Sequence, residues 1–506
     1  MMGIPLLPTP CSLLPLKNMF TNQLSSRSSR LNLFVGLVGI IIGIAAGFAA
    51  GVQPRYIWLA LIAVAAVVYF FAKFEQAVLG LLIIRTCLDP FSAQQIPAVY
   101  AIGVDALTLL YVLVMLLCGR RVQTDGFFWV FAYWVMLQGL WVILLPLGGV
   151  GLDAAFLPES IREWVRLFSL LMVYLLVMQL KERLPPQKMI STLYLALVIP
   201  LTVALMQMFV PHLLPGFLVD GGGGEIGGIP VEGPSRIRGT IGHPNPFATL
   251  LLMFIALTCW KLGNSKYSLP WILMLGVLSF FFVSTKTLTG LTMLATFVLV
   301  FVIPKLSVFY LISGLIFFVF VIGLFANSDF GRQRLDSIAN TPLLNPDIDI
   351  SRAILLAHGD NNSFNWRLSQ WNLLLTSVFP QSPFLGYGLG LSIQAGGNGF
   401  LPHNDFIRAL IEGGIIGFVT FIGFFVAIGL RLIQLIRSAP PGSPQRNLCF
   451  ILLAVMFSIL TGMLSDNIWT HTTLFFYFFT AMAIAGWNWD DLPPAKEKVI
   501  LINTAK

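Results

Sequence analysis

The sequence predicts an all-α polytopic membrane protein with about 12 to 14 transmembrane helices and a long, partly helical loop before the last three of them. Hydrophobic residues make up 57% of the 506 residues and charged residues only 10%, whereas a soluble domain carries about 25% charged residues. Apolar runs near the length that spans a bilayer recur along the chain. The five cysteines are scattered without metal-ligand spacing, which argues against a disulfide framework and against a zinc site.

The apolar runs form three groups, at residues 31–210, 244–326 and 408–488, between polar tails at 1–30 and 489–506. The N-terminal tail lacks a cleavable signal pattern, and the run after it is long enough to span a bilayer. The number of crossings stays open because the third run is short and two runs are tightly joined at Thr285. We expect the spans at about 31–52, 56–72, 76–88, 101–118, 127–147, 163–180, 189–210, 245–261, 269–284, 287–303, 306–326, 408–430, 447–465 and 471–488.

The distribution of lysine and arginine orients these spans. If the N-terminus is cytoplasmic, most of the 30 basic residues fall in cytoplasmic segments, and the short outside loops contain few, as the positive-inside rule requires. We therefore expect both termini in the cytoplasm. Much of the net charge of +8 then reflects this bias, and no nucleic-acid partner is indicated.

Two polar segments lie outside in this frame, at residues 211–243 and 327–407. The first contains the Gly-rich tract Asp220–Glu225, which lacks the Gly-Lys-Ser/Thr ending of a nucleotide P-loop. The second is longer than loops that only connect two helices, and loops of this length are usually functional or disordered. Its stretch Asn365–Leu375 has helical apolar spacing and two tryptophans, which predicts a helix along the outer interface.

The stretch that ends the second segment has the pattern of a capped helix entrance. Asn404 or Asp405 can cap the helix, and Arg408 and Glu412 lie four residues apart on one helical face. His403 then lies immediately before a helix N-terminus, whose partial positive charge favours a neutral imidazole able to accept a proton. Taken alone, the pattern also fits an ordinary helix entrance with an incidental histidine.

Cations that the positive-inside rule does not predict gather on the outside. Each alone could contact a lipid headgroup or a carboxylate, but together they predict a basic site at the membrane surface. Its natural ligand is a lipid-linked phosphate or diphosphate, which arginine binds in bidentate fashion and lysine as a point charge. The residues are Arg236 and Arg238 before a span, Lys286 in the turn 284–287, Arg332, Arg334, Arg352 and Arg367 in the long loop, and Arg408.

Such a site suits transfer of a sugar from a lipid diphosphate to a hydroxyl group. The leaving diphosphate is stable as an anion, so cations can replace a protonated acid, and the acceptor hydroxyl gains from a neutral base such as His403. No cofactor is indicated. His212, His358 and His471 have no companions at ligand spacing, so no metal site is expected either.

Other ionisable residues rank below these. His243 precedes a proline before a span and is interpreted as structural or as a substrate contact. Asp105 and Asp466 lie in or at the ends of apolar runs, where ionisable groups are functional candidates, but the sequence names no partner for them. A further set at the start of the sixth span has the spacing of an ion-pair ladder: Glu159, Arg162, Glu163 and Arg166.

At these residues the sequence resembles the O-antigen ligase and polymerase superfamily over about residues 230–430. Arg236–Asn245 is similar to the family's Arg-x-x-Gly-Thr…Pro-Asn stretch, and Ser284–Gly290 is similar to its small-residue turn, which usually carries Ser-Arg. Three further motifs follow in the family's order: Trp366-Arg367, Pro383-x-x-Gly386-Tyr387-Gly388, and His403-Asn404-Asp405-Phe406 through Glu412-Gly413-Gly414 to Gly417.

The resemblance implies a metal-independent glycosyltransferase in the bacterial inner membrane, with its active site on the periplasmic face. The implied donor is an undecaprenyl-diphosphate-linked glycan, and the acceptor is lipid A–core or a growing polysaccharide. Lys286 departs from the usual arginine and loses its bidentate fork. The implied roles are a base at His403, diphosphate contacts at Arg236 or Arg238, Lys286 and Arg367, and supporting residues at Asn404, Asp405, Arg408 and Glu412.

Several functions remain open at this point. A ligase would move a finished polymer onto lipid A–core or onto a protein, whereas a polymerase would extend a chain on the lipid carrier. A small-anion transporter belongs to another class and would carry charges at mid-membrane and broken helices in matching halves. Because the cations gather outside and no internal repeat is visible, we expect an enzyme.

Overall fold

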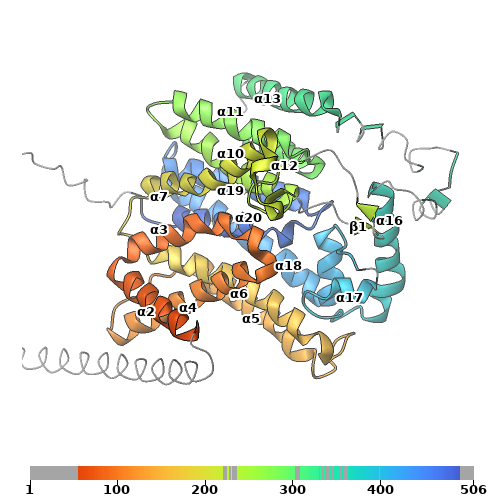
Figure 1. Ribbon diagram of the computed structural model, residues 1–506, viewed down its shortest axis with the longest axis horizontal. Helices are drawn as coiled ribbons and strands as arrows, with labels where there is room; N and C mark the ends of the chain where they lie inside the picture. Colours follow the sequence, from red (N-terminus) through yellow and green to blue (C-terminus); the bar gives the residue numbers. More distant parts are fainter. Residues whose placement is uncertain are drawn as a thin grey trace, which may run out of the picture. The chain divides into compact units, whose positions relative to one another are not determined.

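The computed structural model describes residues 55–489 apart from 220–224, 227–228, 231–235, 303–307, 398 and several short stretches between 330 and 362. The predicted span 31–52, both tails and most of the Gly-rich tract lie outside the described residues, as do Arg334 and His358. The described chain is almost entirely helical (Figure 1), with one short β-ribbon of β1 (Glu225–Ile226) and β2 (Ile229–Pro230). The all-α prediction is confirmed.

The chain divides into two units, and the smaller one holds residues up to 77 together with 106–123. It contains α2 (Arg55–Ala72), the start of α3 (Phe74–Ile84) and the second half of α4 (Ile96–Leu117). Aromatic side chains hold these pieces together: the Phe74 and Tyr111 rings stack at 4.2 Å. Phe70 packs edge-on against the same tyrosine.

The larger unit is a helical bundle built around α10 (Pro244–Asn264) and α20 (Thr472–Ala485), whose side chains are almost all buried. A helix that is apolar all round belongs in the middle of a bundle, because no face of it favours water. The other helices are α5 (Gly126–Leu144), α6 (Leu157–Met178), α7 (Pro186–Leu193), α8 (Val198–Phe209), α9 (Gly216–Val219), α11 (Leu269–Ser284), α12 (Leu288–Val302), α13 (Val308–Asn327), α16 (Ser363–Leu373), α17 (Ser392–Gly396), α18 (Asp405–Ser438) and α19 (Pro444–Gly462).

Six helical stretches among the described residues are long and apolar enough to cross a membrane, and the pair α2 and α3 adds at most one broken span. The polytopic prediction is therefore confirmed, and the protein is a multi-pass membrane protein. The total of 12 to 14 crossings and the orientation stay predictions. The six stretches are Ile96–Leu117, Gly126–Leu144, Pro186–Phe209, Pro244–Asn264, Asp405–Ser438 and Pro444–Gly462.

The long polar segment before α18 is partly helical, as predicted. The helix expected from the two tryptophans is α16, which continues into a π-helical turn at Leu374–Val378. Figure 1 shows α16 and α17 beside the start of α18. The loop between them is anchored to α5, because the Trp141 indole donates to the Leu385 carbonyl over 2.8 Å.

The loop between α16 and α17 provides hydrogen-bond partners at a point where α18 is interrupted. Gly414 has φ 60° and ψ −161°, outside the helical region, so the backbone groups around it lose their helical partners. Backbone bonds from Ile415 to Pro383 (2.8 Å) and from Tyr387 to Ile411 (3.0 Å) replace them, which a membrane helix requires of any interruption. A Cβ on Gly414 would lie 2.3 Å from the Phe384 carbonyl carbon, and this close approach explains the glycine there.

Candidate functional site

The ends of several helices meet around His403, the residue just before α18. Asn404 is the N-cap of that helix, as predicted, and its side chain accepts from the backbone N–H groups of Phe406 (3.0 Å) and Ile407 (3.1 Å). His403 itself has a left-handed backbone with φ 51°. Its N–H donates to the Asn467 side-chain oxygen over 2.9 Å, which fixes this strained residue against the connection between α19 and α20.

The His403 ring faces a carboxylate. Its Nδ1 lies 3.3 Å from Asp466 Oδ1 and 3.2 Å from the Asn467 side-chain nitrogen, and the side chain is 30% exposed. When Nδ1 carries the proton and donates it to Asp466, Nε2 is left as the free proton acceptor. This pairing gives a base whose second nitrogen is oriented by an acid, the arrangement that general-base histidines use.

Asp466 is buried and bonded on both oxygens. Its Oδ2 accepts from the Asn245 side chain over 2.6 Å, and its Oδ1 also accepts from the Asn467 N–H over 2.9 Å. Burial alone would raise the pKa of Asp466, but the hydrogen bond with His403 and the positive charge of Arg367 hold this pKa below its ordinary value. The carboxylate therefore stays ionised beside the imidazole.

Asn245 connects this pair to the predicted cations. Its side-chain oxygen accepts from Arg236 Nη2 over 3.1 Å, and Arg236 Nε donates to the Thr285 carbonyl over 3.0 Å. A continuous set of bonds thus runs from the α11–α12 turn through Arg236, Asn245 and Asp466 to His403. Because these residues stand at the ends of α10, α11, α18 and α19, the helix ends lie on the same side of the bundle.

Lys286 occupies the tip of the α11–α12 turn, next to the carbonyl that Arg236 contacts. Its backbone is left-handed, with φ 54°, and the side chain is partly exposed. Within the described part of the chain, its ammonium group has no hydrogen-bond or ion-pair partner. A lysine held in this way is available to an anionic ligand.

Arg367 joins the same site and Arg238 does not. From α16, Arg367 donates to the Ser465 carbonyl over 2.8 Å, one residue before Asp466. Arg238 is buried, and its Nη1 lies 3.4 Å from the Gly242 carbonyl of its own loop. Of the two arginines between which the sequence could not choose, Arg236 is the one in the network. Arg332 bonds the Asn327 carbonyl instead.

Three members of the site were not assigned roles from the sequence. Asp466 was noted as an ionisable residue at the end of an apolar run, but its partner could not be named because His403 is 63 residues away. No motif or spacing in the sequence indicated a role for Asn467. Asn245 belongs to a recognised motif, and its role as a bridge between Arg236 and Asp466 depends on the packing of α10.

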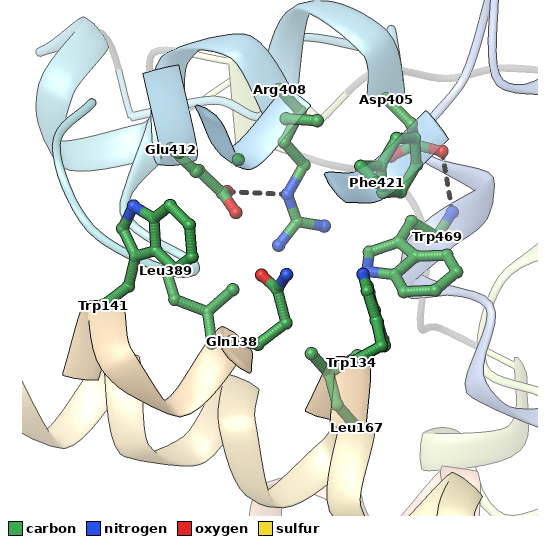
Figure 2. A pocket seen from close by; sticks show the side chains of 13 residues that line it. Trp134, Gln138, Trp141, Leu167, Leu389, Asp405, Arg408, Glu412, Phe421 and Trp469 are labelled. Atoms are coloured by element: carbon green, nitrogen blue, oxygen red, sulfur yellow. Dashed lines mark hydrogen bonds and ion pairs between the residues drawn. The ribbon is translucent and has the colours of Figure 1, made fainter. Parts of the chain in front are cut away.

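Arg408 and Glu412 pair with each other as predicted, but away from His403. Arg408 Nε donates to Glu412 over 2.7 Å, and Nη2 reaches Glu163 of α6 over 2.9 Å. Figure 2 shows this pair above Gln138, at a cavity of about 40 Å³ between Trp134 and Trp141. Glu412 also accepts from Gly390 N–H and the Ser392 hydroxyl. The pair therefore links α18 to α6 and to the segment at Gly390 and Ser392.

Asp405, one of the expected supporting residues, does not contact the His403 ring but bonds the segment that follows Asp466. Its carboxylate accepts from the Trp469 N–H over 2.7 Å (Figure 2), while Arg166 of the predicted ion-pair ladder donates to the Trp469 carbonyl. The Trp469 peptide is thus held from both sides. Since Trp469 lies three residues after Asp466, this clamp fixes the segment that carries the carboxylate.

His471 lies immediately before α20 and is buried. Its Nδ1 lies 3.1 Å from the Thr249 hydroxyl of α10. Burial lowers the pKa of His471 to about 4. The ring is therefore neutral near pH 7 and serves packing rather than charge. Among the described residues, no group of three His, Cys, Asp or Glu side chains is arranged to hold a metal ion.

Comparison with known proteins identifies part of the chain. Residues 251–422 match the model of the O-antigen ligase family, a region that contains Lys286, Arg367 and His403, while Arg236, Asn245 and Asp466 lie outside it. No curated protein matches the chain. The matched region and the multi-pass helical fold support the resemblance to the O-antigen ligase and polymerase superfamily.

Proposed function

We propose that the protein transfers a glycan from a lipid diphosphate to an acceptor hydroxyl, with His403 as general base. The hydrogen bond between His403 and Asp466, connected through Asn245 to Arg236, is the observation that carries this proposal. His403 as the proposed proton acceptor and Arg236 as the proposed phosphate-binding cation belong to one bonded network. Both are needed when a hydroxyl attacks a sugar whose leaving group is an anion.

The cations around the network form the donor site. Arg236 bonds the α11–α12 turn that carries Lys286, and Arg367 bonds the α19–α20 connection that carries Asp466. A lipid headgroup would lie at these helix ends. Arginine can bind two phosphate oxygens with its planar fork, whereas Lys286 supplies a mobile point charge. The ligand that suits this arrangement is an undecaprenyl-diphosphate-linked glycan, whose diphosphate stays at the membrane surface while its chain enters the bilayer.

The reaction then follows from the geometry. His403 Nε2 accepts the proton of the acceptor hydroxyl as its oxygen attacks the anomeric carbon. The bond between that carbon and the diphosphate oxygen breaks, and the electron pair leaves with the diphosphate, whose charge the cations stabilise. Asp466 holds Nδ1 and stabilises the imidazolium that forms. We expect metal-independent transfer, because the arginine and lysine side chains can stabilise the leaving diphosphate as a metal ion does in other glycosyltransferases.

Aromatic rings beside the base fit a carbohydrate substrate. The Trp366 and His403 rings lie 5.9 Å apart, edge to face, and Phe400 lies 5.2 Å from the same indole. Trp366 is partly exposed and Phe400 is exposed. A flat apolar ring next to the reacting atoms can cover one face of a sugar and hold its hydroxyls toward the base.

The acceptor that we favour is lipid A–core or a similar glycolipid, on the periplasmic face of the bacterial inner membrane, with both termini cytoplasmic. A polymerase shares the donor and the chemistry but uses a second carrier-linked chain as acceptor, and a protein-glycosylating ligase uses a protein. We rank transport of small anions below glycan transfer, because the cations of the site sit at helix ends.

The test is transfer by the purified protein, offered lipid-diphosphate glycan together with lipid A–core, a second molecule of carrier-linked glycan, or a protein acceptor. Capped core supports the ligase, longer carrier-linked chains support the polymerase, and a glycoprotein supports the third variant. Uptake of small anions by reconstituted vesicles, without transfer to any of these acceptors, would contradict the proposed enzymatic function.

A further inference from the structure

A second cavity lies at the far end of α10. This helix begins beside the candidate site at Pro244 and ends at Asn264. Its 21 residues span about 31 Å at about 1.5 Å each, which matches the hydrocarbon thickness of a bilayer. The cavity has a volume of about 350 Å³ and lies among the C-terminal ends of α10 and α12, the α18–α19 turn and the start of α19. It therefore faces the opposite membrane surface.

The lining of this cavity changes from polar to apolar with depth. Asn264 ends α10, and Arg446 and Asn447 lie in the first turn of α19, so these three polar residues stand at the level of the helix ends. The Asn447 amide donates to Asn264 over 3.1 Å and ties the two helices together. Cys259 and Ile451 lie one to two turns deeper. A site with this gradient suits an amphiphile with its polar end at the surface.

Among the described residues that line the cavity, Arg446 is the charged one. It is partly buried, and its guanidinium lies 5.8 Å from the centre of the Phe450 ring. None of the ion pairs formed by the described residues includes it. Two other basic residues have partners of their own: Arg431 bonds Asp125 over 2.6 Å, and Lys261 donates to Ser191 over 2.6 Å. The N-terminal end of α19 adds a partial positive charge at the same place.

We propose that this cavity binds an anionic phospholipid. The headgroup phosphate would accept from the Arg446 fork, and its remaining oxygens would meet the two asparagine amides. The first part of an acyl chain would follow Cys259 and Ile451 into the bilayer. Basic pockets between helix ends are the usual places where anionic headgroups are held in membrane proteins. This lipid is separate from the glycan donor, because the two sites lie at opposite ends of α10.

Native mass spectrometry of the full-length protein in detergent tests the proposal, with phosphatidylglycerol and phosphatidylcholine of identical acyl chains as probes. A charged hydrogen bond to phosphate is worth about 1.5 to 3 kcal/mol, so Arg446→Gln should weaken phosphatidylglycerol binding by about tenfold or more. Arg437→Gln is the matched control, because Arg437 is exposed in the last turn of α18 and does not line the cavity.

Cys259 gives a second measurement that does not depend on any charge variant. Its thiol is partly buried in the cavity wall, so bound phosphatidylglycerol should slow its reaction with a maleimide, with Cys118 as the control thiol. Val300→Phe, which fills the cavity without changing charge, should remove the protection. Three results would each overturn the proposal: equal binding of both lipids, unchanged binding to Arg446→Gln, or equal protection by inorganic phosphate alone.

Discussion

Replacing Asp466 by asparagine should remove most of the activity while keeping the bridge to Arg236, although the bond that Oδ1 accepts from the Asn467 N–H is lost. Asparagine keeps an oxygen that can accept from Asn245, so the bridge to Arg236 survives. Its amide nitrogen would then face His403 Nδ1 as a donor. Because Asn467 already offers a second amide nitrogen at 3.2 Å, Nδ1 would have to act as an acceptor. The proton then moves to Nε2 and blocks the base.

The size of the loss follows from the distance and the exposure. Two unit charges about 4 Å apart interact by about 4 kcal/mol at an effective dielectric constant of about 20. The 3.3 Å separation of Nδ1 and Oδ1 gives a similar value, but the imidazole is 30% exposed, and solvent screening lowers the figure to about 3 kcal/mol. Losing this support of the imidazolium should reduce kcat by about 100-fold.

The assay is transfer by purified protein at saturating donor, with kcat and KM measured separately. KM for the donor should stay within about threefold, because the cations are untouched. Asp125→Asn is the control, since that carboxylate is also ion-paired but lies away from the site at the start of α5. A kcat for Asp466→Asn within threefold of wild type would refute the role assigned to the carboxylate.

Three further predictions follow from the same structure. Lys286→Gln should raise the donor KM by about tenfold, because a charged contact worth about 1.5 to 3 kcal/mol is lost, whereas Lys286→Arg should retain affinity; equal KM values for both variants would contradict a diphosphate role. Trp366→Ala should raise the KM for the sugar substrate by about fivefold to tenfold with kcat largely kept, and Trp366→Phe should resemble wild type; a fall in kcat alone would assign the ring to positioning His403. Because the pKa of His471 lies at about 4 in the folded protein against 6.5 ordinarily, the unfolded chain binds a proton that the folded one lacks. Stability is therefore complete above about pH 6.5 and falls by roughly 3 kcal/mol as the pH drops to about 4; melting temperatures should show this loss in wild type and much less of it in His471→Gln.

The sequence predicts the helical fold and several residues that meet at one end of the bundle, because both leave strong local signals. Apolar runs give the spans: the predicted run 269–284 coincides with α11. Misplaced cations point to Arg236, Lys286 and Arg367, and cap chemistry places His403 at a helix start.

The relation between these residues could not be predicted, because it depends on how distant helices pack. Asp466 reaches His403 only because α19 leads back to the same side of the bundle. The pairing of Arg408 with Glu412 is local and was predicted, whereas its second partner, Glu163, belongs to α6. Similarly, only the folded loop shows that Arg238 is buried while the neighbouring Arg236 reaches the turn of Lys286.

The most direct test of the proposed mechanism is the transfer rate of His403→Ala in purified, correctly folded protein. The variant should still bind the lipid-diphosphate donor, because the cations remain, while transfer to the acceptor should fall by at least about 100-fold, the usual contribution of a general base. Transfer at the wild-type rate would contradict the account, because the network from Arg236 to His403 would then have no base to orient.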